Sequence, residues 1–410
     1  MNKKKTINDP LYGFITIPPS IIYDIIAHPF FQRLRFIKQL GLTDFVYPAA
    51  LHTRFQHALG AMHLMGKVLD ILRQKNIEIS TEEYEASQLA VLLHDIGHGP
   101  FSHALEDSLL TGIKHESISY LFMEKLNEEF NGALSLSIKI FRNSYERKFF
   151  HQLVSSQLDI DRLDYLKRDS FFTGVQEGTI GVDRILQTLN VHHDELVVEE
   201  KGLYSIESFL NARRQMYWQV YLHKVTVSTE RMLVNIIRRA KVLVQSGEHL
   251  PASDAFMFFL KEHISLDDFK EKSQVLDSFG ALDDNDIWGA IKFWRSNKDR
   301  ILSLLSTMLL ERKLFQVSLS TEPIRKEMVE KIREAVRKQY GTLGSDTPYL
   351  FSHGTVTNEA YAIGKQINIL TRSGALLDVA QASDLPTIKA ISKIVKKNYL
   401  CWPKNVSLSN

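Results

Sequence analysis

The stretch of residues 90–103 constrains this chain more than any other feature of the sequence. Its first half is apolar and free of glycine and proline, which predicts a buried helix. Its second half contains three histidines and an aspartate. On a helix, His94 and His98 lie one turn apart on one face, with Asp95 beside them, before glycine and proline end the helix. Burying such polar groups costs free energy unless they are paired or bind an ion, so the stretch predicts a divalent metal site.

Composition narrows the class of protein. Of the 410 residues, 44% are hydrophobic and 24% are charged, as in an ordinary soluble globular protein. A net charge of +2 gives no global basic field, so we expect neither nucleic acid nor a membrane surface as a partner. The single cysteine, Cys401, excludes a disulfide framework and fits a cytoplasmic location, and no apolar run is long enough to span a membrane.

The order of periodic segments predicts a mainly α fold in two regions. Residues 1–245 form a helical core, with a small β-hairpin at 191–206 and a long helix over 207–244. The hairpin's expected strands, 195–200 and 203–206, flank a turn at Lys201 and Gly202. The stretch 246–254 contains glycine and proline and is the predicted linker. Residues 246–410 form a C-terminal helical and small α+β region, which can pack as one body with the core and take part in oligomerisation. Its expected elements are helices over 255–312, 321–340 and 387–397 and β segments over 355–361 and 366–379.

Two further stretches carry residues of the same chemical kind. Seven of the 15 histidines lie between His52 and His115, and His57 falls on an apolar helix that Thr53 can cap. A lone histidine on an apolar face is ordinarily a core residue, but this density favours a site. Asp161 adds a distant carboxylate; the alternative for its helix is a surface lined with Asp–Arg pairs, which its apolar neighbours disfavour. Two imidazoles and two carboxylates suit Fe, Mn, Zn, Ni or Mg.

Two clusters of cationic residues each allow two interpretations. Arg33, Arg35 and Lys38 lie on a predicted basic amphipathic helix over residues 30–40, either as a solvated face or as an anion site. A stripe of tyrosine and arginine along residues 213–224 is either packing with solvated charge or a wall for a phosphate and a base. The sequence leaves both choices open.

The ordered motifs resemble a known family. The order of His57, His94 with Asp95, and Asp161 resembles the HD superfamily of metal-dependent phosphohydrolases. The flanking motifs resemble its deoxynucleoside triphosphate (dNTP) triphosphohydrolase group, which includes bacterial dNTPases and the human SAM- and HD-domain dNTPase. These motifs lie at residues 32–41, 53–57, 94–103, 159–165 and 221–224. The resemblance implies a helical HD-domain core.

The resemblance also implies a role for each matching residue. One divalent metal per subunit (Mn, Mg, Fe, Ni or Zn) would be held by His57, His94, Asp95 and Asp161. His98 would lie at the α-phosphate, and His115 would be the general acid, oriented by Glu106 or Glu116 and neighboured by His103. The triphosphate would be neutralised by Arg54, Arg162, Arg213 and Lys224. The remaining substrate-binding positions are Gln39, Leu40, Tyr165, Asp169, Tyr217 and Tyr221.

The implied activity is hydrolysis of a dNTP to deoxynucleoside and inorganic triphosphate, by metal-activated water at the α-phosphate. The implied partners are the dNTP substrate, a nucleotide effector at Asn8, Gln32 and Arg35, and further copies of the chain in a dimer or tetramer. Ala27 stands where the human enzyme has a guanine-selecting aspartate, so we do not expect dGTP to be a uniquely required activator. Two alternatives stay open. One is an HD phosphohydrolase acting on a ribonucleotide alarmone, a cyclic dinucleotide or a nucleic-acid end; the other is a non-catalytic nucleotide sensor.

Overall fold

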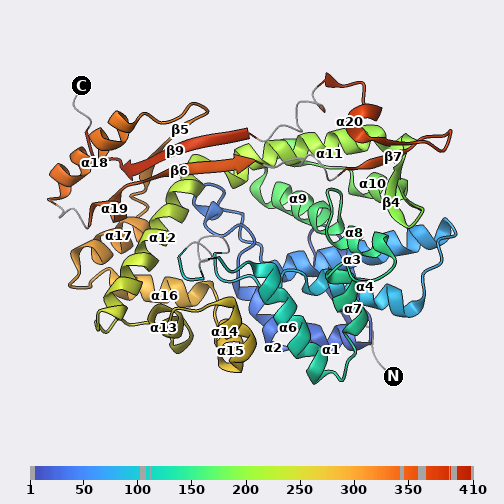
Figure 1. Cartoon of the computed structure of the whole chain (residues 1–410), viewed down its shortest axis with the longest axis horizontal. Coiled ribbons are helices and arrows are strands. Elements are labelled where there is room, and N and C mark those ends of the chain that lie inside the picture. Colours follow the sequence, from blue (N-terminus) through green and yellow to red (C-terminus); the bar gives the residue numbers. More distant parts are fainter. Residues whose placement is uncertain are drawn as a thin grey trace.

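A computed structural model of the chain describes residues 5–101, 108–110, 112–341, 346–358, 366–386, 388 and 395–407. These residues form a mainly α protein with small β regions, which confirms the predicted fold class. Figure 1 shows helices filling most of the molecule, while short strands gather in two places near its upper edge. None of the described helices combines the length and the apolar content of a membrane span.

The first part of the chain is a short hairpin followed by helices. The hairpin strands β1 and β2 pair antiparallel, with Asn8 opposite Phe14. Helix α3 begins directly after Thr53, whose backbone N–H donates to the Gln56 side chain (2.8 Å). The elements are β1 (Lys5–Asp9), β2 (Gly13–Ile17), α1 (Ile21–Ala27), α2 (Pro29–Gln32), η1 (Arg33–Phe36), η2 (Thr43–Phe45), α3 (Arg54–Gln74), α4 (Thr81–Leu93), α6 (His115–Glu129), α7 (Ser135–Phe141), α8 (Lys148–Val154) and α9 (Ile160–Thr173).

The predicted helix over residues 30–40 is wrong beyond its first turns. After α2 and the 3-10 turn η1, Ile37 is extended and Lys38 forms an isolated β-bridge with Thr53. The N–H of Gln39 donates to the carbonyl of His52 (2.9 Å), so this segment takes its backbone partners from the chain that leads into α3. The amphipathic spacing of residues 37–40 therefore does not produce a helix, because these residues pair with the segment before α3 instead.

The middle part of the chain contains a hairpin, but its strands are β3 and β4, so its turn lies earlier in the sequence than predicted. The turn is His193–Asp194, both with positive φ (49° and 61°), and residues 203–206 begin a helix instead of the second strand. The predicted helix over 207–244 is broken by a π-helical turn, η5, and restarts with His223 as its N-cap. The elements are η3 (Gln176–Gly178), α10 (Val182–Thr188), β3 (Leu189–His192), β4 (Glu195–Glu199), η4 (Glu200–Gly202), α11 (Leu203–Met216), η5 (Tyr217–Tyr221) and α12 (Lys224–Gln245).

The C-terminal region is helical first and mixed afterwards, as predicted. Strand β5 was missed, and the helix expected over 321–340 starts only at Lys326, after Pro323. The helix expected over 387–397 is wrong at its end, because Val395 begins strand β9; Thr387 and residues 389–394 lie outside the described residues. The elements are α13 (Asp254–Lys261), α14 (Leu266–Glu271), α15 (Ser273–Gly280), α16 (Asp284–Trp294), α17 (Arg300–Leu310), β5 (Phe315–Ser320), α18 (Lys326–Tyr340), α19 (Thr347–Leu350), β6 (Ser352–Asn358), β7 (Asn368–Leu370), β8 (Leu376–Asp378), α20 (Val379–Ala382) and β9 (Val395–Pro403).

Several contacts join the C-terminal region to the core. Strand β7 pairs parallel with β4, which creates the four-stranded sheet β3-β4-β7-β8, while β5-β9-β6 forms a separate antiparallel sheet. The buried carboxylate of Asp284 in α16 accepts from the backbone N–H groups of Lys38 (3.0 Å) and Phe101 (3.1 Å). One cluster of buried hydrophobic side chains runs through both regions.

The turn after α4 packs tightly on the start of α6. Helix α4 ends at Leu93, so the prediction that His94 and His98 share one helix is wrong. The Ser119 hydroxyl of α6 donates to the carbonyl of His94 (2.7 Å) and accepts from the N–H of Gly97 (2.9 Å). A Cβ at Gly97 would lie 2.2 Å from the Ser119 nitrogen and 2.4 Å from the His115 carbonyl oxygen. The absence of a side chain at Gly97 therefore lets α6 approach the turn.

We predict that Gly97→Ala lowers the free energy of unfolding by about 1–3 kcal/mol, because backbone atoms must move to admit the methyl group. The matched control is Gly289→Ala in α16, where an added Cβ meets no atom within 4 Å. That control should be neutral or stabilising by up to about 1 kcal/mol, since alanine favours a helix interior. Urea unfolding of the two variants measures the difference; equal stabilities would contradict the packing argument.

Candidate metal centre and active site

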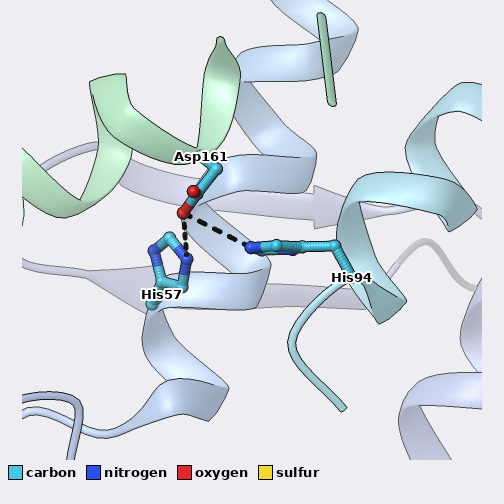
Figure 2. Close-up of side chains that lie close together, drawn as sticks. All are labelled: His57, His94 and Asp161. Carbon is cyan, nitrogen blue, oxygen red and sulfur yellow. Dashed lines mark ion pairs between the residues drawn. The ribbon is translucent and has the colours of Figure 1, made fainter. Parts of the chain in front are cut away.

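Three of the four predicted metal ligands converge at one point. His57 lies on α3, Asp161 on the first turn of α9, and His94 directly after α4. Figure 2 shows the Asp161 carboxylate between the two imidazole rings, and its Oδ1 lies 3.1 Å from His57 Nε2 and 3.3 Å from His94 Nε2. One ligand atom from each residue lies within 4.8 Å of the others. The arrangement could hold a metal ion.

The fourth predicted ligand, Asp95, lies beside this cluster. Its Oδ1 is 3.3 Å from His94 Nε2, and its Oδ2 is 3.9 Å from His57 Nε2. Arg54 donates to Asp95 Oδ2 at 2.5 Å. Asp95 also belongs to a second group of candidate ligand atoms, with His98 and His115. It therefore connects the metal cluster to the predicted catalytic histidines.

Hydrogen bonds at Nδ1 orient both imidazoles. His57 Nδ1 lies 2.8 Å from Asp164 Oδ2, and His94 Nδ1 lies 2.6 Å from the carbonyl oxygen of Val91. Both acceptors favour a proton on Nδ1 and so leave the Nε2 lone pair facing the cluster. Each Nε2 is buried and makes no hydrogen bond within the described part of the chain. A divalent cation would satisfy both nitrogens.

The electrostatics of the cluster favour a cation. Burial lowers the pKa of His57, but Asp161 and Asp164 outweigh it and raise that pKa to about 10. Burial likewise opposes protonation of His94, whereas Asp95 and Asp161 raise its pKa to about 9. The imidazoles bind protons tightly because buried carboxylates surround them. The nitrogen and oxygen donors thus fit a divalent metal, without selecting among Mn, Mg, Fe, Ni and Zn.

The two predicted catalytic histidines stack on each other next to Asp95. The ring centroids of His98 and His115 are 3.7 Å apart, and His98 Nδ1 lies 3.3 Å from Asp95 Oδ1. Burial and the nearby Arg54 lower the pKa of His98 to about 3, so its ring is neutral. His115 Nδ1 lies 3.7 Å from a Glu116 carboxylate oxygen. The other two predicted neighbours, His103 and Glu106, lie outside the described residues.

Arg33 supports the turn that carries these histidines. It was expected on a solvated face or in an anion site, and the first interpretation is wrong because Arg33 is buried. Its buried guanidinium donates to the carbonyls of Ile96 (2.7 Å), His98 (3.1 Å) and Leu282 (3.1 Å). Arg33 therefore links the turn after α4 to the C-terminal region. Lys38 instead pairs with Asp44 (2.8 Å).

The predicted phosphate-binding residues lie on four helices, α3, α9, α11 and α12, and mostly have protein partners. Arg54 contacts Asp95 as described above, and Arg162 pairs with Asp159, the N-cap of α9. Arg213 is buried and donates to Gln157 (3.0 Å). Lys224 is exposed at the first residue of α12. A bound triphosphate would compete with these protein acceptors for the three arginines.

Four of the remaining predicted substrate-binding residues, Tyr165, Asp169, Tyr217 and Tyr221, gather around the π-helical turn η5. Tyr221 packs edge-on against both Tyr165 (6.3 Å between centroids) and Tyr217 (5.4 Å). The Tyr221 hydroxyl donates to Asp169 Oδ2 (2.8 Å), and His52 Nε2 lies 2.7 Å from Asp169 Oδ1. Turns of this π-helical kind recur at functional sites, where they re-aim side chains. Both carboxylate oxygens of Asp169 thus already have protein partners.

Two other predicted substrate residues, Gln39 and Leu40, follow the extended segment after η1. Both are half-buried. Gln39 Oε1 is buried and accepts no hydrogen bond within the described residues. A hydroxyl donor from a ligand would satisfy this oxygen.

The predicted effector residues lie on the N-terminal segment. Arg35 Nε donates to the Gln32 side chain (2.7 Å), and its guanidinium lies over the Phe55 ring (3.6 Å to the centroid). Asn8 is exposed on β1. Gln32 and Arg35 are therefore in contact, but their neighbours include protein groups that an effector would have to displace or share.

Sequence reasoning missed several residues that support the site. Asp164 orients His57, Arg168 pairs with Asp164, and His52 pairs with Asp169. The spacing of four residues between Asp164 and Arg168 was an available signal for an ion pair on one helix. His52 was counted in the histidine-rich stretch but given no role.

Two family models match parts of the first two thirds of the chain, and one relative matches nearly all of it. The HD domain model matches residues 54–169, which contain all four predicted metal ligands, and the HD associated region matches residues 180–253. The uncharacterized protein YwfO of Bacillus subtilis is 30% identical over 99% of this chain and 94% of its own length. The SAMHD1 homolog of Dictyostelium discoideum, a deoxynucleoside triphosphate triphosphohydrolase, is 32% identical over 62% of this chain, which spans only 52% of that relative.

Solved structures agree with this likeness. A phosphohydrolase of Bacteroides thetaiotaomicron is 49% identical with a TM-score of 0.94, over 98% of this chain and 100% of that one. A hypothetical protein of Aquifex aeolicus is 27% identical with a TM-score of 0.72, over 98% of this chain and 97% of that one. The chain therefore belongs to the HD-domain family of phosphohydrolases, in the group that includes the SAMHD1-type triphosphohydrolases.

Proposed function

We propose that this protein hydrolyses deoxynucleoside triphosphates to deoxynucleoside and inorganic triphosphate. The observation that carries the proposal is the buried cluster of His57, His94 and Asp161, joined through Asp95 to the stacked pair His98–His115. Named relatives with triphosphohydrolase activity support the choice of a dNTP, although the chain spans only about half of them. The proposed location is the cytoplasm.

A divalent ion bound at His57, His94, Asp95 and Asp161 would supply Lewis-acid polarisation and neutralise charge near the scissile bond. The protein's own contribution is to hold these donors in place before substrate arrives. Nδ1 contacts with Asp164 and Val91 fix both imidazoles, and Arg54 restrains Asp95. Preorganisation of this kind lowers the reorganisation needed during reaction.

The proposed chemistry breaks the bond between the α-phosphorus and the 5′ oxygen of the nucleotide. A water oxygen joins the α-phosphorus, and the departing 5′ oxygen needs a proton. His115 is half-exposed and lies against His98, so it can reach the leaving group as general acid, while neutral His98 can contact the α-phosphate. Of the two glutamates proposed to orient His115, Glu116 lies within the described residues and is next to its ring.

The substrate proposal assigns the arginines to the triphosphate and the tyrosines to the nucleoside. Arg54, Arg162 and Arg213 can exchange their present acceptors for phosphate oxygens, which guanidinium groups bind in a bidentate manner. The tyrosine ring cluster at η5 would form an apolar wall without space for a 2′-hydroxyl. The unsatisfied Gln39 oxygen would accept from the 3′-hydroxyl.

Product analysis tests the proposal most directly. Each dNTP and NTP is incubated with the protein and Mn or Mg, and the products are separated by ion-exchange chromatography. We expect triphosphate and deoxynucleoside from dNTPs, and little reaction with GTP. Pyrophosphate as product, or cleavage of GTP or guanosine tetraphosphate but not dGTP, would favour another HD activity. Nucleotide binding without turnover would favour a sensor.

The metal assignment predicts the behaviour of two ligand variants. Asp161→Ala and Asp95→Asn should abolish both bound metal and hydrolysis, because each removes an anionic oxygen donor. Helix content should change little. Elemental analysis after dialysis and far-UV circular dichroism measure the two properties. The control is Asp267→Asn, an exposed residue paired with exposed Lys270; full metal content in the ligand variants would refute the assignment.

The general-acid assignment predicts a different pattern for His115→Ala. This variant should retain metal and nucleotide but lose turnover by roughly a hundredfold or more, since it removes only the proton donor. Metal content, equilibrium binding of a dNTP and the turnover number are measured on the same preparation. A near-normal turnover number would remove His115 from the mechanism.

We also propose a homodimer or homotetramer with a nucleotide effector at the N-terminal segment. Support comes from Phe14 and Phe36, which are 74% and 54% exposed on this segment, close in sequence to Asn8 and Arg35. The contacts between α16 and the core support the proposal that residues 246–410 pack as one body with it.

Arg35→Ala should therefore reduce assembly or nucleotide-dependent activation and leave metal content unchanged. Solution mass and activity, measured with and without each dNTP, test this expectation. Because Ala27 offers no carboxylate, dGTP should not be a uniquely required activator. A monomer that is active at every concentration would refute the assembly proposal, and strict dGTP dependence would refute the interpretation of Ala27.

A further inference from the structure

A continuous chain of buried charged groups connects the N-terminal hairpin to the metal cluster. Asp9, at the end of β1, accepts from Arg168 Nη1 through Oδ2 (2.8 Å). Arg168 donates from Nε (2.9 Å) and Nη2 (3.0 Å) to both oxygens of Asp164. Asp164 Oδ2 in turn lies 2.8 Å from His57 Nδ1. Each link is a charge-assisted hydrogen bond.

These linked charged side chains are isolated from solvent. Arg168, Asp164 and His57 have no exposed surface, and Asp9 is 5% exposed. Buried charges keep their geometry only when each is paired, so moving one group disturbs the next. The linked charged side chains therefore form a physical path between the hairpin and a candidate metal ligand.

The surrounding structure holds these charged side chains in one arrangement. A Cβ at Gly60, one turn after His57 on α3, would lie 2.0 Å from Asp164 Oδ1 and 2.2 Å from Arg168 Nη2. The second oxygen of Asp9 accepts from the backbone N–H groups of Leu11 (2.9 Å) and Tyr12 (3.2 Å), which fixes the hairpin turn. Asp9 thus holds the hairpin turn with one oxygen and Arg168 with the other.

We propose that Asp9 is a positioning residue for His57, acting through Arg168 and Asp164, so that closure of the N-terminal hairpin and metal binding stabilise each other. The inference rests on the metal centre of the proposed function but is independent of the substrate. Carboxylates behind a ligating histidine raise its basicity and fix its ring. Arg168 and Asp9 extend that support to an element far from the metal. Coupling between two sites is reciprocal, so metal should also steady the hairpin.

The test uses Asp9→Asn in the full-length protein. The amide oxygen can still accept from Leu11 and Tyr12, whereas an NH₂ group would face Arg168 and lose the ion pair. Cobalt(II) is titrated into the metal-free protein, and its visible absorption reports affinity and ligand geometry without any substrate. We expect cobalt affinity to fall by about tenfold and the absorption bands to shift, with a loss of up to about 100-fold for Asp164→Asn.

The matched control is Asp183→Asn. Asp183 also forms a carboxylate–cation pair with a helix, to Lys67 of α3 (2.8 Å), but it is 73% exposed and has no contact with the chain of buried charges. Its cobalt affinity and spectrum should equal those of the wild type. An Asp9→Asn protein that is less stable but binds cobalt with wild-type affinity and spectrum would show a purely structural role and overturn the proposal.

A second measurement needs no variant and covers the case in which Asp9→Asn fails to fold. Hydrogen exchange of the hairpin amides, including those of Leu11 and Tyr12, is compared in wild-type protein with and without cobalt. Slower exchange on metal binding supports the coupling, and unchanged exchange contradicts it. A wild-type protein that binds no divalent metal would overturn both this proposal and the proposed metal centre, whereas normal binding with no effect at Asp9 overturns this proposal alone.

Discussion

The structure depends on two buried carboxylates, Asp95 and Asp164, and the half-buried Asp161, which surround two imidazoles inside an apolar helical core. Such a concentration of negative charge is unfavourable unless cations compensate it. Arg54 and Arg168 supply part of the compensation, and the raised pKa values of His57 and His94 show that the cluster still attracts positive charge. A divalent metal is the simplest species that meets this demand while using the Nε2 lone pairs of both imidazoles.

The chemistry of the side chains predicted which residues lie together better than hydrophobic periodicity predicted the helices and turns that carry them. His57, His94, Asp95 and Asp161 could be named from the sequence because such groups on apolar segments must find one another or remain unsatisfied. Their local backbone was less predictable. Helix α4 ends before His94, since the turn instead takes its partners from Ser119 and Arg33. The helical mainly α class followed from apolar spacing, whereas the hairpin turn moved to His193–Asp194.

The parts that could not be predicted are those that join distant segments. Arg33 has the spacing of a solvated cation, yet its two Nη groups donate to three carbonyls, one of them from Leu282. Asp9 reads as a turn residue, but one of its oxygens binds Arg168. Strand β7 pairs with β4 although about 170 residues separate Val198 from its partner Ile369. Local composition carries no signal for such partners, because each depends on which surfaces the fold brings together.

The two imidazoles are supported by different parts of the sequence, so segments that are distant from the site contribute to its geometry. His57 depends on Asp164 and Arg168, and through them on the N-terminal hairpin. The turn after His94 depends on Arg33, which also donates to the carbonyl of Leu282. Asp284, two residues after Leu282, accepts from the backbone N–H of Phe101. Small shifts of the hairpin or of α16 would thus act on different ligands of the same centre. The geometry of the candidate centre therefore depends on the packing of both the hairpin and α16, and not only on the residues that carry the candidate ligand atoms.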